Sequence, residues 1–411
     1  MKMNAVVAGV GMTHFGKMLD RGLKSIGAEA VDAAIKNAGM TNSDIEAAFV
    51  GNAAAGLVTG QESIRGQVVL RSAGIGKIPV INVENACASA STALHQAAAM
   101  VTAGLYDVVL AVGVEKLYHE DKRKSFGAFS GAVDVEAMAE IMARLKDGAK
   151  DAAPGSTGEG AGENRSMFMD IYAAAARNHM KRFGTTIQQF AGVSAKNSFH
   201  GSMNPRAQFR EVLSVEDVLN APTIAAPLTR PMCSPIGDGA AAVVVISEQK
   251  ARRLGLISPV RITSMVLHSG WDHAPGEEGG AAELCAREAY EEAGLGPTDL
   301  SVIELHDASA PAEIMAYESL GLCAKGEGGS LIDSGETRLG GRLPVNTSGG
   351  LLRKGHPVGA TGIAQIVELT EQLRGDSGSR QVKGAKVALA HNGGGSIGSD
   401  AAAMCVSVLV R

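Results

Sequence analysis

The chain has 411 residues, of which 45% are apolar, enough for two or three domains with large buried cores. Its 38 Lys and Arg against 43 Asp and Glu give a net charge of -5, which offers no overall attraction for nucleic acid or an acidic membrane surface. The longest unbroken apolar stretches, such as residues 239–246, are far shorter than the roughly 18 to 20 residues that cross a bilayer. These values exclude binding of nucleic acid by bulk charge, and they exclude a membrane-spanning helix.

The first strand is expected at the N-terminus, where residues 1–11 alternate apolar residues with glycine. This segment has no basic flank, long apolar core or small-residue cleavage site, so no signal peptide is predicted. The last four residues do not form a peroxisomal address of the Ser-Lys-Leu type, and a cytoplasmic location is the expectation. The five cysteines are too scattered for a disulfide framework or a Cys-x-x-Cys zinc site.

An internal duplication organises the chain. Residues 29–50 align with residues 284–305 without a gap, and each copy has helical periodicity, then a glycine, an aspartate and an apolar run of strand length. Both copies are therefore predicted to form a helix, a turn and a strand. The loop that follows the second copy, 306–308, is polar enough for catalysis, whereas the equivalent loop 51–53 is not.

A weaker correspondence links residues 79–114 with residues 344–395. Each segment is predicted to begin with a short strand, pass through a loop of small residues into an amphipathic helix, and finish in a second strand. The predicted strands cover residues 81–83 and 108–112 in the first copy, and 345–346 and 386–390 in the second. Strands that alternate with helices in both copies predict an α/β fold with largely buried sheets.

Residues 118–230, between the two halves, break this rhythm. They contain a charge run at 120–124, a glycine-rich segment at 151–162 and a helical stretch at 167–183. We interpret them as an inserted lid over one face of the molecule. A glycine-containing turn within residues 231–247 then leads into a central strand.

We therefore expect three parts. Residues 1–117 together with 231–250 form the N-terminal half, residues 118–230 form the lid, and residues 251–411 form the C-terminal half. The two duplicated halves are expected to stack into one layered core that carries the inserted lid.

Cys87 follows a predicted strand and stands at the start of a predicted helix, within the small-residue loop 85–91. The N-terminus of a helix is expected to lower the pKa of a thiol and to present free N–H groups that can hold an oxyanion. This setting suits a nucleophile. A small buried cysteine at the start of a helix is the alternative interpretation.

Three histidines lie in loops or at strand ends of the second half. His356 lies in the polar loop 349–359 before a helix, and the duplication places that loop opposite the Cys87 loop, which suggests a Cys/His pair. His306 directly follows a strand, and His391 follows the predicted strand 386–390. Active sites of α/β proteins gather at such strand ends.

Two other kinds of site are not expected. The glycines between residues 9 and 16 resemble a dinucleotide fingerprint, but the third glycine is misplaced and no acidic residue closes a βαβ unit at the right place. No metal site is predicted, because no short-spaced pair of ligands occurs among the histidines at positions 95, 306, 356 and 391.

Together, these loops resemble the four catalytic loops of the thiolase superfamily, and their arrangement is similar to thiolases of the sterol-carrier-protein type. The resemblance runs over nearly the whole chain. It is carried by the Cys87 loop, the lid segment 204–210, Gly237-Asp238-Gly239, His306-Asp307 and Gly355-His356-Pro357. It implies a thiolase-like fold and a homodimeric core, with the strand at residues 107–112 resembling the edge through which thiolases pair.

The resemblance assigns a role to each of these groups. Cys87 matches the nucleophile that the thioester acylates, and His356 matches the base that takes its proton. His306 matches a side chain that holds the thioester oxygen together with His356. The N–H groups of Cys87 and Gly393 match the donors that hold the oxygen of the acyl-enzyme.

The chain departs from the family at the residue that carries out the second proton transfer. Ordinary thiolases have a second cysteine where His391 stands, and sterol-carrier-type thiolases have a cysteine after His-Asp, where this chain has Ala308. We expect His391 to take over this proton transfer, since an imidazole with an unperturbed pKa of roughly 6.5 serves as acid or base near neutrality. A histidine that only packs beside the Gly393 turn is the alternative.

The favoured function is CoA-dependent cleavage of a β-ketoacyl-CoA through an acyl-Cys87 intermediate. CoA is the co-substrate, and no permanently bound cofactor is expected. The lid residues Lys122, Arg123 and Lys124 are either solvated or contact the CoA phosphates. Three alternatives stay open: a condensing synthase of the ketosynthase or hydroxymethylglutaryl type, a retro-aldolase acting on a β-hydroxyacyl-CoA, and a non-catalytic acyl-CoA-binding scaffold.

The His-Asp-Ala loop at 306–308 carries a further implication. Chains with this loop resemble thiolases that pair with a small zinc-ribbon and OB-fold protein and act on bulky branched, steroidal or aromatic acyl-CoAs. The resemblance therefore implies such a partner subunit and a substrate of that class, with 2-benzoylsuccinyl-CoA as one candidate. Acyl transfer from a substrate to Cys87 separates the thiolase hypothesis from the scaffold and the retro-aldolase.

Overall fold

The structure is a computed structural model that describes residues 3–147, 165–257, 259–274, 279–398 and 400–411. The glycine-rich segment 151–162, which the sequence places in the lid, lies outside the described residues. Within the described ranges, no helix is long and apolar enough to cross a membrane.

The described strands form one nine-stranded sheet, in the order β3-β2-β4-β7-β1-β8-β11-β10-β9, and a separate two-stranded sheet, β5-β6. The strands are β1 (Ala5–Met12), β2 (Ala47–Gly51), β3 (Val80–Val83), β4 (Val108–Glu115), β5 (Thr223–Ala225), β6 (Leu228–Thr229), β7 (Gly239–Ser247), β8 (Val260–His268), β9 (Val302–Glu304), β10 (Val387–Gly394) and β11 (Ala403–Val410).

Strand pairing confirms the duplication. Strands β2 and β4 pair in parallel, and so do β9 and β10. The next neighbours, β7 and β11, are antiparallel to β4 and β10, and each is followed by a further antiparallel strand, β1 or β8. The two halves join where β1 pairs with β8 over only three residue pairs, so one continuous sheet contains two copies of the same order.

Fifteen α-helices are described. They are α1 (Leu23–Asn37), α2 (Ala55–Thr59), α3 (Arg65–Ser72), α4 (Ser89–Thr102), α5 (Lys122–Gly127), α6 (Met138–Asp147), α7 (Phe168–Phe183), α8 (Ile187–Ser202), α9 (Val215–Asn220), α10 (Glu248–Arg253), α11 (Ala281–Ala293), α12 (Ala310–Ser319), α13 (Gly328–Asp333), α14 (Gly350–Arg353) and α15 (Thr361–Arg374).

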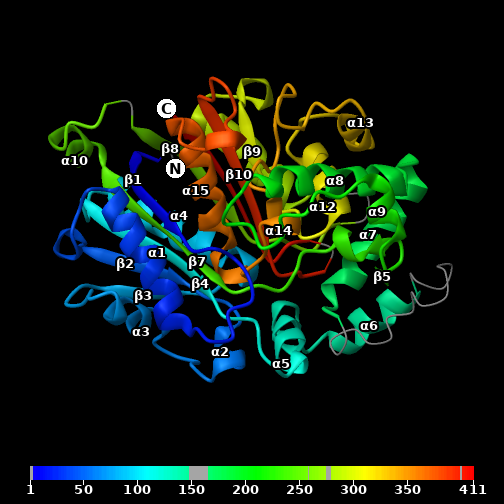
Figure 1. The fold of residues 1–411 in the computed structure, drawn as a ribbon, viewed down its shortest axis with the longest axis horizontal. Coiled ribbons are helices and arrows are strands. Elements are labelled where there is room, and N and C mark those ends of the chain that lie inside the picture. Colours follow the sequence, from blue (N-terminus) through cyan, green and yellow to red (C-terminus); the bar gives the residue numbers. More distant parts are fainter. Residues whose placement is uncertain (1–2, 148–164, 258, 275–278, 399) are drawn as a thin grey trace.

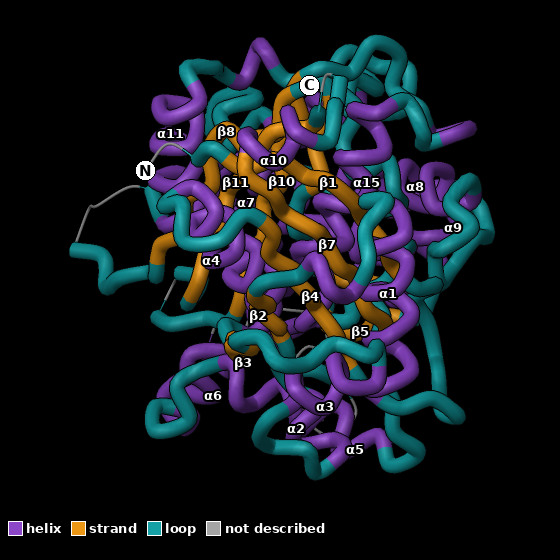
Figure 2. The backbone as a smooth tube through the Cα atoms, turned by 90° about the vertical axis from the view of Figure 1, so that its left-hand side faces the viewer, coloured by secondary structure: helices purple, strands orange, loops and turns teal. Residues whose placement is uncertain are grey.

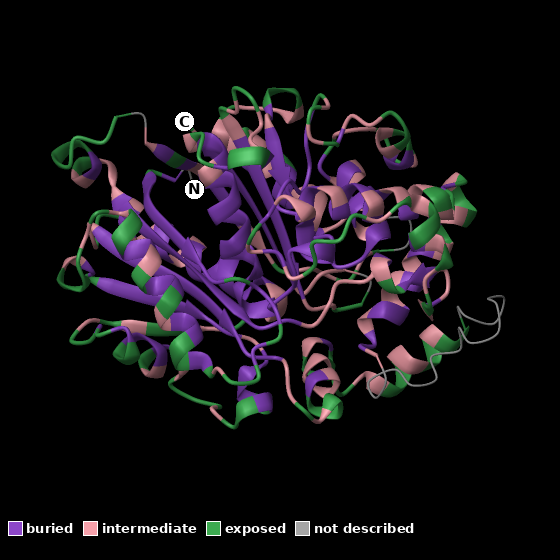
Figure 3. Cartoon of the chain, viewed as in Figure 1, coloured by how far each residue is buried: buried purple, intermediate pink, exposed green. Residues whose placement is uncertain are grey.

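Two equivalent helices, α4 and α15, form the middle layer of the core. Their apolar side chains share one buried cluster with strands of both halves. Helices α1 and α3 cover the opposite face of the first half, and α11 and α12 cover that of the second. Figures 1 and 3 show this order of layers, with buried strands and a buried α15 at the centre, and Figure 2 shows from the side that helices surround the strands.

Helix α15 is buried on nearly every side, including its polar residues. A helix in such a place needs internal partners for its polar groups. Glu368 pairs with the Arg380 guanidinium at 2.9 Å, and Gln365 donates to the His391 carbonyl at 3.1 Å. These contacts join the helix to the loop that follows it and to β10.

The aligned glycines end the equivalent helices as predicted. Gly39 and Gly294 follow α1 and α11 with φ values of 66° and 68°. This left-handed conformation favours glycine and stops a helix. Each turn then leads into a strand of the parallel pair, β2 or β9.

The correspondence between residues 79–114 and residues 344–395 holds with two differences. Residues 345–346 do not form a strand, because Val345 makes only an isolated bridge to Ile303 and Asn346 takes a φ of 56°. Strand β10 continues past the predicted end at residue 390 to Gly394, since β11 pairs with it up to Ala403. His391 therefore lies within a strand and not in a loop after it.

The prediction that the strand at residues 107–112 is a sheet edge is wrong. This strand, β4, has neighbours on both sides, β2 and β7. The edge of the first half is β3, whose four residues are exposed or partly exposed. Both strands are rich in valine, so composition alone did not distinguish the interior strand from the edge.

The described parts of the inserted segment, residues 118–147 and 165–230, are mostly helical. The stretch predicted at residues 167–183 is α7, and a buried apolar cluster joins α7 and α8 to α12 and α14 of the second half. Figure 1 shows these helices grouped beside the sheet. The central strand predicted after this segment is β7, but residues 234–238 before it form no turn and instead make isolated bridges, Asp238 with Gly16 and Ile236 with His356. The limits of the halves and of the lid, near residues 117, 230 and 250, stay a prediction.

Candidate active site

Cys87 lies in a tight turn between β3 and α4. The turn is a short 3-10 helix, Ala86–Ala88, and Ala86 takes a φ of 47°. Strand β10 approaches this turn so closely that a Cβ on Gly394 would lie 2.2 Å from the Asn85 carbonyl oxygen. Only glycine fits at position 394. Because it has no side chain, the end of β10 can pack directly against the Cys87 turn.

His356 lies in the loop after α14, and a hydrogen bond sets its tautomer. The Thr361 hydroxyl donates to the Pro357 carbonyl at 3.0 Å, so it can only accept from the His356 ring, 2.7 Å away. Nδ1 of His356 therefore carries the proton. Nε2 keeps a free lone pair, which is what a general base requires.

His306 has the opposite tautomer. The Asn392 amide nitrogen lies 2.9 Å from His306 Nδ1, and the Ser91 hydroxyl donates to the other end of that amide at 2.7 Å. The amide therefore donates to Nδ1, and the proton of the His306 ring is on Nε2. His306 offers an N–H donor where His356 offers a lone pair.

These side chains meet at one point. The thiol of Cys87 and one ring nitrogen each of His306 and His356 all lie within 4.8 Å of one another. The two imidazole rings are edge to face, with centroids 5.2 Å apart. Because Nδ1 of each ring is engaged in a hydrogen bond, Nε2 is the nitrogen left for a ligand.

Such a set of sulfur and imidazole atoms could also hold a metal ion of the zinc type. The proton on His306 Nε2 opposes this use, because a ligating imidazole nitrogen must offer a lone pair. A substrate oxygen, which accepts hydrogen bonds, suits the set better.

Burial keeps the three groups uncharged. It raises the pKa of Cys87 to about 12, with the Glu115 carboxylate adding to the rise. Burial, together with Lys354, lowers the pKa of His356 to about 3. For His306, burial and the neighbouring His356 place the pKa well below its usual value. The expectation of a thiol with a lowered pKa is therefore wrong, since desolvation outweighs the backbone N–H donors at the start of the helix.

His391 lies beside this group but is not a near-neutral acid or base. Burial lowers its pKa to about 4. Its Nδ1 accepts the backbone N–H of His306 at 3.4 Å, so its proton is on Nε2. That Nε2 is buried and has no hydrogen-bond partner among the described residues. His391 is a neutral N–H donor that faces the cavity.

Backbone N–H groups also reach the sulfur. Hydrogen bonds from the N–H of Gly395 and of Cys87 itself partly offset the effect of burial on the Cys87 pKa. Gly393 and Gly395 both line the cavity. Gly395 is a donor that the sequence did not single out, and the role expected of the Gly393 N–H stays a prediction.

Glu115, at the end of β4, fastens the loops around Cys87 and His356. Its buried carboxylate accepts the backbone N–H groups of Ala54 at 3.2 Å and Gly359 at 2.9 Å. Burial raises the pKa of Glu115, and these N–H donors oppose the rise. The loop 51–53, which the sequence judged unsuited to catalysis, is joined to the same carboxylate, because the Ala53 N–H donates to Glu115 at 3.1 Å.

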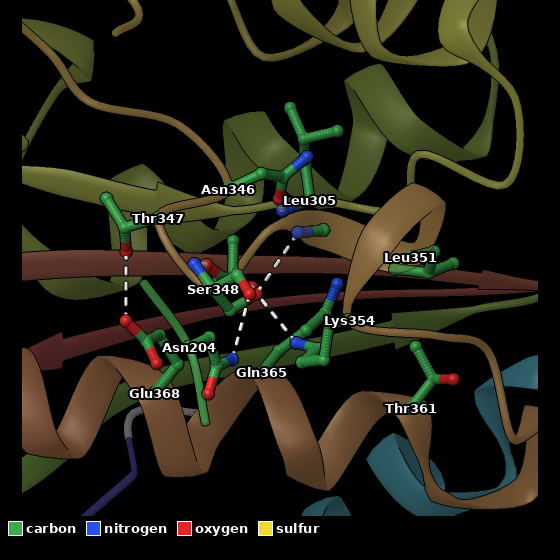
Figure 4. Close-up of polar contacts among 12 residues, drawn as sticks. Asn204, Leu305, Asn346, Thr347, Ser348, Leu351, Lys354, Thr361, Gln365 and Glu368 are labelled. Atoms are coloured by element: carbon green, nitrogen blue, oxygen red, sulfur yellow. Dashed lines mark hydrogen bonds and ion pairs between the residues drawn. The ribbon is translucent and has the colours of Figure 1, made fainter. Parts of the chain in front are cut away.

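A second buried carboxylate, Glu304 at the end of β9, holds the loop that leads to His356. It accepts the Ser348 hydroxyl at 2.6 Å and pairs with the Lys354 ammonium at 3.2 Å. The Asn204 amide donates to the Ser348 carbonyl at 2.8 Å. Figure 4 shows Asn204, Ser348 and Lys354 gathered above α15. The lid segment 204–210 thereby fixes a loop of the second half.

The cluster of Cys87, His306 and His356 opens onto a cavity of about 1090 Å³, above the roughly 300–1,000 Å³ of most small-molecule sites. Cys87, His306, His356 and His391 all line it. Most of the remaining wall is apolar and comes from the lid and its neighbours: Phe126, Phe129, Phe168, Met169, Ile171, Tyr172, Phe209, Ile236, Met315 and Met404.

The basic run of the lid reaches the cavity at one residue. Lys122 lines the cavity, together with Lys17 from the first half. Arg123 instead pairs with Asp121 at 3.1 Å and is 80% exposed, so its charge is already neutralised. Arg123 and Lys124 are not among the residues that line the cavity.

Sequence reasoning singled out the four side chains Cys87, His306, His356 and His391 that line this cavity, and it missed the groups that orient them. Thr361 and Asn392 set the two tautomers, and Ser91 orients the Asn392 amide. Asn392 directly follows His391 in the glycine-rich segment, which is a signal that could have been used. Thr361 and Ser91 are ordinary helix residues in the sequence.

Comparisons with known proteins agree with this site. The thiolase N-terminal domain matches residues 5–249, and the thiolase C-terminal domain-like family matches residues 275–407. The chain therefore belongs to the thiolase family.

Two relatives and one solved structure extend this result. An acetyl-CoA acetyltransferase of Methanothermobacter thermautotrophicus is 39% identical over 402 residues, which cover 97% of this chain and 98% of that protein. The benzoylsuccinyl-CoA thiolase subunit BbsB of Thauera aromatica is 36% identical over 395 residues, 95% of this chain and 94% of that one. The structure of the Ltp2-ChsH2(DUF35) aldolase matches 99% of this chain and 98% of its own with a TM-score of 0.77 at 27% identity. The chain is an acyltransferase of the thiolase family that acts on acyl-CoA.

The neutral state of Cys87 gives a testable pH dependence. Alkylation by iodoacetamide requires the thiolate, so its rate at Cys87 should rise about tenfold per pH unit from pH 7 to 9, without a plateau. Peptide mass mapping of the alkylated protein measures this rate, and Cys87→Ser provides the blank. A plateau with a midpoint below pH 8 would show an activated thiolate and contradict the effect of burial.

Proposed function

We propose that the protein cleaves a β-ketoacyl-CoA with free CoA through an acyl-cysteine intermediate on Cys87. One observation carries this proposal: the thiol, the free lone pair of His356 and the N–H donor of His306 converge within 4.8 Å at the wall of one cavity. A nucleophile, a base and an oxygen-binding donor are what acyl transfer to a thiol needs.

The first half-reaction begins with a proton transfer inside the site. His356 Nε2 takes the Cys87 proton as the sulfur attacks the keto carbon, which avoids a buried thiolate at rest. The carbon–carbon bond then breaks, leaving an acyl group on Cys87 and a carbanion stabilised by its CoA thioester. The His306 N–H holds the thioester oxygen, where negative charge collects.

The second half-reaction returns the enzyme to its starting state. Free CoA attacks the acyl group, and the N–H groups of Cys87 and Gly393 hold the acyl oxygen, with Gly395 beside them. The leaving Cys87 sulfur recovers its proton from His356. CoA is thus a co-substrate, and the proposed cycle uses no permanently bound cofactor and no metal.

The cavity supports a bulky acyl group. Its aromatic lining from the lid, including Phe126, Phe129 and Phe168, offers stacking surfaces that a short acyl chain would leave in contact with water. We propose branched or aromatic β-ketoacyl-CoAs as the substrate class. Similarity to a benzoylsuccinyl-CoA thiolase subunit makes 2-benzoylsuccinyl-CoA a member of that class to test.

Two lysines are proposed to bind the phosphates of CoA. Lys122 and Lys17 line the same cavity from the lid and from the first half, and phosphates bind ammonium groups readily. Of the basic run expected at this position, Lys122 is the residue that the cavity lining supports. Arg123 is less suited because it pairs with Asp121.

Retro-aldol cleavage of a β-hydroxyacyl-CoA is the second candidate, since the solved structure that matches this chain is an aldolase. A retro-aldolase needs neither an acyl-cysteine nor free CoA. The convergence of Cys87 with His356 favours the thiolase reaction. Dependence on free CoA separates the two reactions directly.

Two kinds of assembly are proposed. The exposed edge strand β3 supports a homodimer that pairs along it, and light scattering at micromolar concentration should give twice the monomer mass.

The structural neighbour contains a second subunit, ChsH2(DUF35). We propose a small zinc-ribbon and OB-fold partner for this chain as well, which co-purification would detect.

A substrate panel tests the proposed reaction. β-Ketoacyl-CoAs with short, branched and aromatic acyl groups should be cleaved only when free CoA is present, and the branched or aromatic members should give the highest kcat/KM. Each compound is assayed by loss of the β-ketothioester, with and without a candidate partner subunit. Cleavage of β-hydroxyacyl-CoAs at the same rate without CoA would instead identify a retro-aldolase.

His391→Ala tests the remaining buried donor. Loss of its N–H from the cavity should lower kcat by about 10²-fold, because a donor that holds developing negative charge contributes on that scale. Cys87 should still be acylated, which intact-mass measurement shows. His391→Gln keeps an N–H donor and should recover part of the rate. Normal turnover of His391→Ala would show that His391 only packs beside the Gly393 turn and takes no part in the reaction.

A further inference from the structure

The proposed cycle leaves one proton without a donor. When the carbon–carbon bond breaks, the carbanion must be protonated on carbon, and later the thiol of CoA must lose a proton. His356 already holds the proton of Cys87 at this stage. A different group must serve both steps, and it must face the same cavity.

His391 is poorly placed for this role. Its Nδ1 is taken by the backbone N–H of His306, so it has no free lone pair for a second proton. Giving up the Nε2 proton would leave a charged imidazolate in a buried place, which is costly. His391 is better suited to hold an oxygen than to move a proton.

One face of helix α7 forms part of the cavity wall. Phe168, Ile171, Tyr172 and Ala175 all line it, at the spacing of three and four residues that places side chains on one face of a helix. Tyr172 is the one protic side chain among these four. It packs beside Phe168, with ring centroids 6.4 Å apart.

The phenol of Tyr172 and the thiol of Cys87 line the same cavity. Burial raises its pKa, and the charge of a Cys87 thiolate would raise it further, so the phenol is protonated at rest. Tyr172 is half-buried, and among the described residues its hydroxyl has no hydrogen-bond partner, although a tyrosine hydroxyl inside a protein usually has one. The hydroxyl of Tyr317, by comparison, is held by Lys196 and Glu313.

We propose that Tyr172 is the acid and base that replaces the missing second cysteine, donating its hydroxyl proton to the carbanion carbon and then accepting the proton of CoA. This inference rests on the proposed thiolase reaction. It assigns proton transfer to a lid residue and leaves His391 as an oxygen-binding donor.

The protons and electrons balance over the cycle. The carbanion lone pair takes the Tyr172 proton, a C–H bond forms, and the phenolate remains. The phenolate then takes the proton of the CoA thiol, which is the more acidic of the two groups. The resulting CoA thiolate attacks acyl-Cys87, and the sulfur of Cys87 recovers its proton from His356. Both Tyr172 and His356 end as they began.

Tyr172→Phe tests this role with two exchange reactions of acetyl-CoA. Wild-type enzyme in D₂O should exchange the methyl protons of acetyl-CoA for deuterium, which requires a group that moves protons at carbon. It should also exchange the acetyl group between unlabelled and isotope-labelled CoA, which requires Cys87 and His356. The variant should lose proton exchange by about 10²-fold or more. At about pH 8 to 9, where much of the free CoA is already thiolate and needs no base, the variant should retain acetyl exchange within about fivefold.

Tyr106→Phe is the matched control, since it removes the same oxygen from a residue outside the cavity lining and should leave both reactions unchanged. Retention of proton exchange by Tyr172→Phe would overturn the role of Tyr172. Equal loss of both reactions with a lower Tm would overturn it in favour of a structural role. Loss of proton exchange in His391→Ala alone would move the role to His391. Absence of acetyl exchange in the wild type would contradict the thiolase reaction itself, and the role of Tyr172 with it.

Discussion

Removal of water from one cluster of thiol and imidazole groups governs the chemistry of this molecule. The two duplicated halves meet around α4 and α15, and this packing places Cys87, His306 and His356 where the protein excludes most solvent. Charged forms are costly in such a place. The thiol therefore stays protonated, the imidazoles stay neutral, and charge appears only when a substrate supplies an atom to bear it.

Hydrogen bonds then give the two histidines, His356 and His306, different tautomers. Thr361 directs the free lone pair of His356 toward the cluster, whereas Asn392 leaves a proton on the corresponding nitrogen of His306. The two histidines, proposed as base and as oxygen-binding donor, thus owe their different tautomers to the hydrogen-bond partner of each ring. The carboxylates of Glu115 and Glu304 hold the loops that carry these histidines, so the buried ionic contacts act on position and not on the reaction itself.

The sequence predicted those parts that depend on local pattern and duplication. Repeated helix, glycine and strand segments revealed both halves, and the family resemblance of the Cys87, His306, His356 and His391 loops identified the residues that meet. It did not predict which strand is an edge, because β4 and β3 are similarly apolar. The protonation of Cys87 was also misjudged, since a helix N-terminus is visible in the sequence and burial by distant strands is not. Tyr172 lay in a predicted helix whose cavity-facing side only the tertiary structure reveals.

The most direct test of the account is to locate the acyl group during turnover. Wild-type protein is mixed with acetoacetyl-CoA and, in parallel, with an aromatic β-ketoacyl-CoA, quenched in acid within one turnover, and mapped by peptide mass. The account predicts a stoichiometric acyl adduct on Cys87 that disappears on addition of CoA and is absent from Cys87→Ala. Cleavage without any adduct on Cys87, or an adduct that persists in Cys87→Ala, would contradict it.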